Sequence, residues 1–494
     1  MEAKLFAMEL PASGSIYYSH DLPPTMPRID IPGFDNGLCI GPYAHSVWWY
    51  GERKDLDIDR GPHTNPQHVL RSFADKELAW IHAHGRPRYP FDREYMDSFE
   101  HKKQDPQEHA NSLKDYLSLI PYLIPTNSTA HTPTLRHPDL SPNNILITDD
   151  LIITGFIDWQ HAMVLPAWLT AGIPPAFENH ADEGSRGLQI PKLPDDLQSM
   201  DKSARARAEE QYRRRHIHFW YLALTQKLNE QHWRAYMGHD GAFITRNMFL
   251  QAGVIWQGNN AHLQIDLSQV VRNWSAFASP SADGSIPTCP VVIEEQEMQR
   301  RENLRISLQE GDVFTKNMSE AMGVLPDGSV SHENFHVAKE RESMIREGVL
   351  TKLKDDPFEA ERVLLAWPFH DFDEDEWRDS VCMSLVLYAH LCMTQDNALC
   401  REDRHFHSSC ADAVEFMPFA MSSQYRSNPN ALNASMSDAH FIVCTNAANA
   451  KSLIEEAVVS NPHRRAFRHS EHLRYRLCTS RRQARHKNSI RTQG

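Results

Sequence analysis

One short stretch of the chain carries the residue types that phosphoryl transfer requires. Residues 135–160 read LRHPDLSPNNILITDDLIITGFIDWQ, and they place Asp158 fourteen residues after Asn144. Transfer of a phosphoryl group needs a carboxylate at the acceptor hydroxyl and oxygen ligands for magnesium, which neutralises the phosphates. An H-x-D-x-x-x-x-N loop supplies the carboxylate and one amide ligand, and here it consists of His137, Asp139 and Asn144. Asp158 would supply the second ligand.

Two short β-type runs must bring Asn144 and Asp158 together. The runs NNILIT and LIITGFID flank Asp149 and Asp150, and turn-forming residues between two apolar runs indicate a β-hairpin. A hairpin returns the chain to its starting point, so the connecting strands have the right length to place Asn144 beside Asp158.

A structural role is the alternative for each of these residues taken alone. An Asp or Asn in a tight loop can cap a turn, and His137 can be a core histidine bonded to the backbone. The complete set at these offsets favours a kinase-type ancestry. Ancestry does not establish activity.

Helical patterns dominate the rest of the body. Asn65-Pro66 and Asp105-Pro106 are typical helix starts, and Gly85 is a typical stop. Ala208, Tyr212, Phe219 and Ala223 form one apolar stripe of a long helix. The fold class is therefore α+β and predominantly helical, with helices expected over residues 65–85, 105–123, 201–233, 240–255, 292–322, 332–350 and 356–367.

The composition indicates a soluble globular body followed by a tail. The chain has 494 residues, 41% of them hydrophobic, and we expect one domain over residues 1–375. Residues 376–494 lack apolar periodicity, which predicts a mostly disordered tail. Its last part, 461–494, has ten Lys and Arg against one Glu, whereas the whole chain has a net charge of −14. An acidic body disfavours nucleic acid as a partner.

Neither a membrane segment nor a disulfide framework is predicted. No apolar run approaches the roughly 20 residues that span a bilayer, and the first residues do not resemble a secretory signal or a mitochondrial presequence. The eight cysteines are sparse and irregular, which fits a reducing, intracellular compartment. Cys400, His405, His407 and Cys410 have zinc-ligand types, but their spacing matches no standard finger, so a metal site there is not the favoured interpretation.

The motif resembles the catalytic and metal loops of the aminoglycoside phosphotransferase and choline kinase family. It is most similar to the fungal branch that includes the altered-inheritance-of-mitochondria protein. The resemblance continues through WWYGER, LDIDRGP, LPAWLTAGIP and RRRHIHFWYLALTQKLNE, and it covers roughly residues 1–375. Pro138 and Ser141 stand where the wider family has Gly and His, as in the fungal branch. The resemblance implies Asp139 as the catalytic base, with Asn144 and Asp158 as magnesium ligands.

The same resemblance implies Mg²⁺ and ATP as cofactors and a protein-kinase-like fold. In that fold a small β-rich lobe precedes the motif and supplies a phosphate loop, a strand lysine and a helix glutamate. Residues 1–20 already resemble the entry to the large C-terminal lobe, so we expect the small lobe to be missing here. Its absence argues against nucleotide binding and activity by this chain alone.

Lys54 and Glu77 imitate the missing lysine and glutamate only crudely. Gly33, Gly37 and Gly41 precede them, but these glycines recur every four residues and Lys54 lies in a charged turn. We therefore expect Lys54 not to bind nucleotide.

Three functions remain open at this point. The first is ATP-dependent transfer of phosphate to a small-molecule hydroxyl, inactive without the small lobe. The second is a pseudokinase-like binding or scaffold protein with a protein partner, at the mitochondrion by family resemblance and otherwise cytoplasmic. The third and weakest is a metal phosphoesterase that uses His137, Asp139, Asn144 and Asp158, for which His161 is the one further ligand nearby.

Overall fold

The described part of the chain divides into two compact units. The first runs from Met1 to Arg346, and the second begins at Glu347. The domain boundary expected at residue 375, the tail 376–494 and the cysteine and histidine cluster at 400–410 lie outside the described residues. The computed structural model describes residues 1–34, 37–180, 182–238, 241–280, 283–324 and 330–369.

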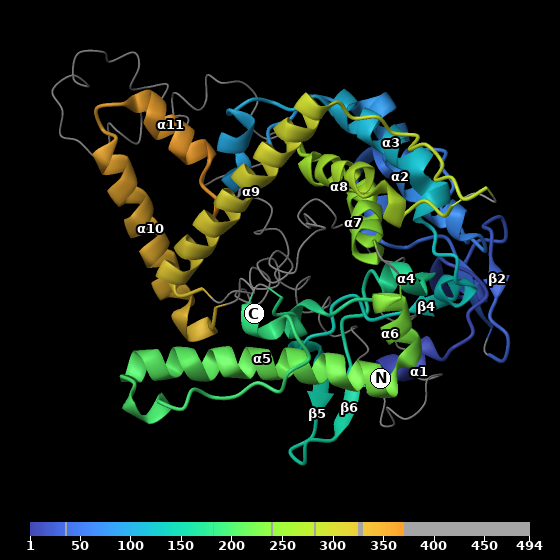
Figure 1. The fold of residues 1–494 in the computed structure, drawn as a ribbon, viewed down its shortest axis with the longest axis horizontal. Coiled ribbons are helices and arrows are strands. Elements are labelled where there is room, and N and C mark those ends of the chain that lie inside the picture. The colour runs from blue at the N-terminus through green and yellow to red at the C-terminus, as the bar shows by residue number, and fades with distance from the viewer. Residues whose placement is uncertain (35–36, 181, 239–240, 281–282, 325–329, 370–494) are drawn as a thin grey trace, which may run out of the picture. The chain divides into compact units, whose positions relative to one another are not determined.

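The two helices with marked ends form as the sequence predicts. α2 (Pro66–His84) begins after Asn65, and α3 (Pro106–Leu123) begins after Asp105. Each cap side chain accepts a hydrogen bond from a main-chain N–H of the first turn. A proline at the first helical position has no N–H to leave unsatisfied. Both helices also contact α7 (Ala242–Gly253), so they belong to one helical layer (Figure 1).

The remaining helices of the first unit surround this layer or lie beside the strands. α8 and α9 pack against each other and extend the layer, whereas α5 packs on α6. The second unit begins within α10 and contains α11 (Pro357–Leu365). The other helices are α1 (Glu2–Phe6), α4 (Ala167–Thr170), α5 (Lys202–Leu228), α6 (Glu230–Met237), α8 (Ala261–Arg272), α9 (Glu295–Met322) and α10 (Phe335–Lys352).

The prediction of a single helix over residues 201–233 is wrong in one respect. The helix ends at Leu228, and a second helix begins after Asn229. The side chain of Asn229 accepts a hydrogen bond from the N–H of His232, 3.3 Å away, and so caps α6. Asparagine favours such caps over helix interiors. The stripe expected to be core is half-buried, because α5 contacts α6 and short 3₁₀ segments instead of the central helices. That stripe is Ala208, Tyr212, Phe219 and Ala223.

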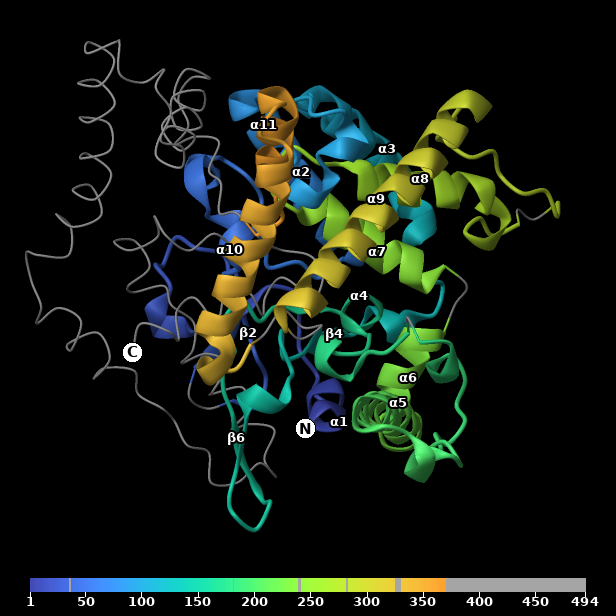
Figure 2. The ribbon, with the colours of Figure 1, turned by 90° about the vertical axis from the view of Figure 1, so that its left-hand side faces the viewer.

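In the part of the chain that the structure describes, three small antiparallel sheets accompany the helices, and only the hairpin among them was predicted. The hairpin pairs β5 with β6, with Ile145 opposite Phe156, and it projects from the body in both views (Figures 1 and 2). The other sheets have the order β1-β3-β2 and β4-β7. The strands are β1 (Ser15–Tyr18), β2 (Ile29–Asp30), β3 (Leu38–Gly41), β4 (Pro133–Leu135), β5 (Ile145–Ile147), β6 (Ile153–Phe156) and β7 (Val164–Pro166).

A small hydrophobic cluster anchors the motif. Leu140, which follows Asp139, and Trp159, which follows Asp158, are both buried in it. Leu5 of α1 and Ile16 of β1 belong to the same cluster. Apolar residues next to each carboxylate therefore fix the two loops against one common core.

The described residues confirm a helix-dominated α+β class. Their strands form two- and three-stranded antiparallel sheets, and most of the buried apolar side chains come from helices. Within the described ranges, none of the helices combines the length and the apolar character needed to cross a membrane.

Candidate functional site

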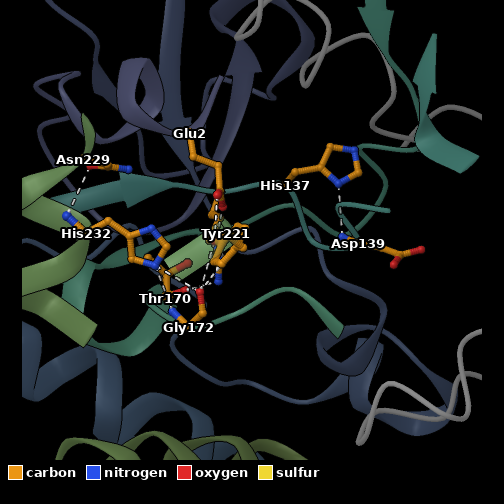
Figure 3. Close-up of polar contacts among 9 residues, drawn as sticks. Glu2, His137, Asp139, Thr170, Gly172, Tyr221, Asn229 and His232 are labelled. Atoms are coloured by element: carbon orange, nitrogen blue, oxygen red, sulfur yellow. Dashed lines mark hydrogen bonds and ion pairs between the residues drawn. The ribbon is translucent and has the colours of Figure 1, made fainter. Parts of the chain in front are cut away.

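His137 joins the Asp139 loop to the hairpin. Its side chain is buried, and the main-chain N–H of Asp139 donates to Nδ1 at 3.2 Å (Figure 3). Because Nδ1 accepts, Nε2 carries the proton and donates to the carbonyl oxygen of Ile157 at 2.8 Å. One imidazole therefore holds both Asp139 and the residue before Asp158. The structural interpretation of His137, as a histidine bonded to backbone, is what the geometry shows.

Asn144 is bonded to the predicted base. Its Nδ2 donates to the carbonyl oxygen of Asp139 at 2.7 Å and lies 3.2 Å from the carboxylate Oδ2 of the same residue. The side chain is almost fully buried, with 2% of its residue surface exposed. Because the amide nitrogen faces Asp139, the amide oxygen is the atom suited to bind a cation.

Asp158 lies at the base of the hairpin, one residue after Ile157, which pairs with Asn144. The N–H of Ile157 donates to the carbonyl oxygen of Asn144 at 3.0 Å. Asp158 has a φ of 69°, a left-handed conformation that residues other than glycine rarely adopt and that recurs at functional sites. The neighbouring Trp159 is buried and donates to the carbonyl oxygen of Phe156 at 3.0 Å. The indole therefore anchors the residue that follows Asp158.

The structure thus brings the three predicted site residues to one place. Asp139 and Asn144 are in contact, and Asp158 follows the residue that pairs with Asn144. The Asn144 amide oxygen and the Asp158 carboxylate are hard oxygen donors of the kind that Mg²⁺ prefers, so these two residues fit that cation. Within the described ranges, no three or more His, Cys, Asp and Glu side chains group as a metal site.

His161 ends the loop that Asp158 begins. It too has a φ of 69°, and the main-chain N–H of Ser46 reaches its Nδ1 at 3.5 Å. Its ring lies 4.8 Å from the ring of His45. Burial lowers the pKa of His161 to about 4, although the Asp158 charge acts in the opposite direction. A neutral imidazole therefore lies beside Asp158 at physiological pH.

Lys54 and Glu77 do not form a pair. Lys54 is exposed in a short 3₁₀ helix, Gly51–Asp55, whereas Glu77 is fully buried on α2. Glu77 binds Arg53 through both oxygens and the Nζ of Lys76 at 3.2 Å. The geometry agrees with the rejection of Lys54 as a nucleotide-binding lysine, and it gives Glu77 a different role within the core.

Sequence reasoning missed the arginine directly before the motif. Arg136 follows β4 and precedes His137, and its guanidinium lies among polar groups from α1, α4 and α5. A charged residue between the buried Leu135 and His137 was the available signal, because an arginine there must find partners.

The region around the motif is similar to a known protein family. Residues 56–169, which include the whole motif, match the phosphotransferase enzyme family. Subtelomeric hrmA-associated cluster proteins from two strains of Aspergillus fumigatus are 27% identical over 408 residues, which is 76% of this chain and 76% of each relative. No solved structure matches the chain.

More distant relatives come from two yeasts. Altered inheritance of mitochondria protein 9 of Lachancea thermotolerans is 23% identical over 253 residues, covering 46% of this chain and 39% of that protein. The protein of the same name from Kluyveromyces lactis is 24% identical over 252 residues, with the same coverage. These findings confirm the resemblance seen in the motif: residues 56–169 match the phosphotransferase enzyme family, and the chain is a distant relative of the fungal altered-inheritance-of-mitochondria proteins.

Proposed function

We propose that this chain is a kinase-like phosphotransferase lobe whose reaction is ATP-dependent transfer of phosphate to the hydroxyl group of a small molecule. The observation that carries the proposal is the assembly of Asp139, Asn144 and Asp158 at the base of the hairpin. Membership of residues 56–169 in the phosphotransferase family supports it. The left-handed backbone at Asp158 supports it independently, because such strain needs a reason.

Each residue has a distinct part in the proposed reaction. Asp139 accepts the proton of the acceptor hydroxyl, and the bond from its N–H to His137 orients the loop that carries it. Asn144 and Asp158 would hold Mg²⁺, which when bound neutralises the phosphate charges. The Asn144 amide nitrogen also contacts the Asp139 carboxylate, 3.2 Å away, and so joins the proposed base to a proposed metal ligand.

The proposal includes weak nucleotide binding by this chain. Among the described residues that precede the motif, Lys54 is exposed and Lys76 is bound to Glu77 and to the carbonyl oxygen of Gly253 at 2.9 Å. Lys76 is therefore occupied within the core, and Lys54 lies at the surface. Because removing one preorganised donor typically costs about 10²–10³ in rate, we expect little phosphoryl transfer from the isolated chain.

A thermal melt with and without Mg-ATP tests nucleotide binding. Ligand stabilisation follows RT ln(1 + [L]/Kd), so 1 mM ATP against a millimolar Kd gives about 0.4 kcal/mol, which is hardly detectable. A micromolar Kd would give about 4 kcal/mol and a rise in Tm of several degrees. We expect the small effect.

Two variants would identify the residues behind a large rise in Tm with Mg-ATP. A shift abolished by Asp158→Asn would demonstrate a working nucleotide site and contradict weak binding. A shift abolished by Lys54→Ala as well would identify Lys54 as the phosphate-binding lysine and overturn its rejection.

A binding protein without catalysis is the second candidate, and one surface favours it. The hairpin beside the site exposes Leu151, Ile152 and Ile153, with 77%, 61% and 43% of their surface accessible. An apolar projection of this kind suits a protein partner better than a small molecule. The names of the yeast relatives support the mitochondrion as the place to look for such a partner. Co-fractionation of the chain with mitochondria tests that location.

A further inference from the structure

A partly buried polar network surrounds the residue that precedes the motif. The Arg136 side chain is 13% exposed and its Nε donates to Oε1 of Glu2 at 2.7 Å. Its Nη1 and Nη2 donate to the carbonyl oxygens of Thr170 at 2.9 Å and Gly172 at 2.7 Å. Nη2 also reaches the hydroxyl of Tyr221 at 2.9 Å. All three guanidinium nitrogens are therefore used, by groups from three helices and one loop.

The partners of Arg136 are bonded to one another (Figure 3). The Tyr221 hydroxyl donates to Oε2 of Glu2 at 2.7 Å, and Nε2 of His232 lies 3.0 Å from the carbonyl oxygen of Gly172. The ring of Tyr221 also stacks on Phe177, with 5.3 Å between centroids. Because these partners are themselves held in place, the Arg136 guanidinium is held in one position.

The network contains one negative and one positive side chain. Burial alone would raise the pKa of Glu2, but the Arg136 charge lowers it below its usual range, so Glu2 stays ionised. Burial lowers the pKa of His232 to about 4, with help from the Arg136 charge, so the imidazole stays neutral. One carboxylate therefore balances one guanidinium inside the protein.

The network continues directly into the candidate site. Arg136 is the residue between the end of β4 and His137, and the two sides of His137 bond to Asp139 and to Ile157. A shift of Arg136 would move the His137 backbone and both of these contacts. We propose that Arg136, fixed by Glu2 and Tyr221, is a positioning residue that sets the place of the Asp139 loop and of the Asp158 ligand. The roles of Asp139 and Asp158 rest on the proposed function, whereas the positioning of their loops does not.

Hydrogen exchange of the intact chain, measured by mass spectrometry, tests the positioning role. Arg136→Lys keeps the charge opposite Glu2 but loses the planar fork that serves Thr170, Gly172 and Tyr221 together. We expect amides in 137–144 and 153–160 to exchange about tenfold faster, since loss of bonds of this kind opens structure locally. Amides of α2 and α3 should be unchanged. Unaltered exchange in both loop segments, or equal acceleration in α2, would overturn the proposal.

Two further variants keep the test decisive. Tyr221→Phe removes only the hydroxyl, keeps the stacked ring, and should accelerate the same segments to a smaller degree. Arg246→Lys is the matched control, because Arg246 is another buried arginine that reaches main-chain carbonyls, those of Trp168 and Tyr236, but does not adjoin the motif. Its replacement should leave the exchange of 137–144 unchanged. Acceleration there equal to that in Arg136→Lys would count against a specific role.

Mn²⁺ affinity, measured by electron paramagnetic resonance, separates this inference from the proposed function. Arg136→Lys should weaken Mn²⁺ binding about tenfold, the usual effect of losing a residue that orients metal ligands. Mn²⁺ binding that Asp158→Asn leaves intact would refute the metal site, and the exchange result would still decide the role of Arg136. Binding that is lost in Asp158→Asn but kept in a normally folded Arg136→Lys would refute the positioning role alone.

Discussion

Glu77→Gln should cost about 3–5 kcal/mol of unfolding free energy, the range for removing one partner of a buried ion pair. Glu77 is fully buried with Arg53 and Lys76, and it also accepts the N–H of Trp256 at 2.5 Å. Burial alone would raise the pKa of Glu77, but the charges of Arg53 and Lys76 lower it to about 2. Glutamine leaves two buried cations without a counter-charge. Chemical denaturation at pH 7 measures the loss.

The pH dependence of this loss is a second check. Burial lowers the pKa of Lys76 to about 8, even though Glu77 favours the charged form. Without Glu77, Lys76 can release its proton as the pH rises, so the destabilisation should be smaller at pH 9 than at pH 6. Glu100→Gln is the control, because Glu100 is exposed and its pair with Lys102 lies in solvent. The control should not change Tm; a Glu77 variant as stable as the wild type would contradict this account of the core.

Asp266→Asn should stabilise the protein by roughly 4 kcal/mol at pH 8, by the linkage between pKa and stability. Burial within α8 raises the pKa of Asp266 from 3.8 to about 7. The folded protein therefore holds a proton that the unfolded chain releases between these values. The stability contribution of that proton is complete below pH 4 and is lost as the pH rises through 7. Asparagine cannot ionise, so its advantage should shrink to about 1–2 kcal/mol at pH 5.

Denaturation curves at pH 5 and pH 8 measure this difference. Asp195→Asn, at an exposed position of a loop, is the matched control and should leave the pH profile unchanged. A parallel loss of stability with pH in the wild type and in Asp266→Asn would show that Asp266 ionises normally in the folded protein.

Elements with local signals could be predicted from the sequence. Asn65 and Asp105 each cap a helix through their own side chains, so the start of α2 and of α3 depends on neighbouring residues alone. The hairpin is equally local, since its two strands are joined by the short turn at Asp149 and Asp150. The two helices are found within one residue of the predicted ends, and the two strands within two residues.

Elements that depend on distant partners could not be predicted. The strand Ser15–Tyr18 exists because it pairs with Leu38–Gly41, which lies about twenty positions further along the chain. α8 was also missed, because the polar Gln264, Asp266 and Ser268 are buried on it and obscure the apolar period. Tertiary contacts decide such segments, and the local pattern does not report them.

The residues of the candidate site also differ in whether the sequence could predict them. Asp139, Asn144 and Asp158 were recognised because their offsets follow from one loop and one hairpin. Arg136 was missed because its partners include Glu2, which lies 134 positions earlier. Contacts at such separations leave no periodic or spacing signal in the sequence, so only the folded chain shows which residue supports the loop.

Mn²⁺ binding to the full chain tests most directly the claim that Asn144 and Asp158, beside the proposed base Asp139, form one cation site. Mn²⁺ accepts the same oxygen ligands as Mg²⁺ and is detected by electron paramagnetic resonance. Asp158→Asn and Asp150→Asn change the same residue type within one hairpin, the first at its base and the second in its exposed turn. We expect weak binding at one site, reduced at least tenfold in Asp158→Asn and unchanged in Asp150→Asn. Equal binding by the wild type and Asp158→Asn would contradict the site.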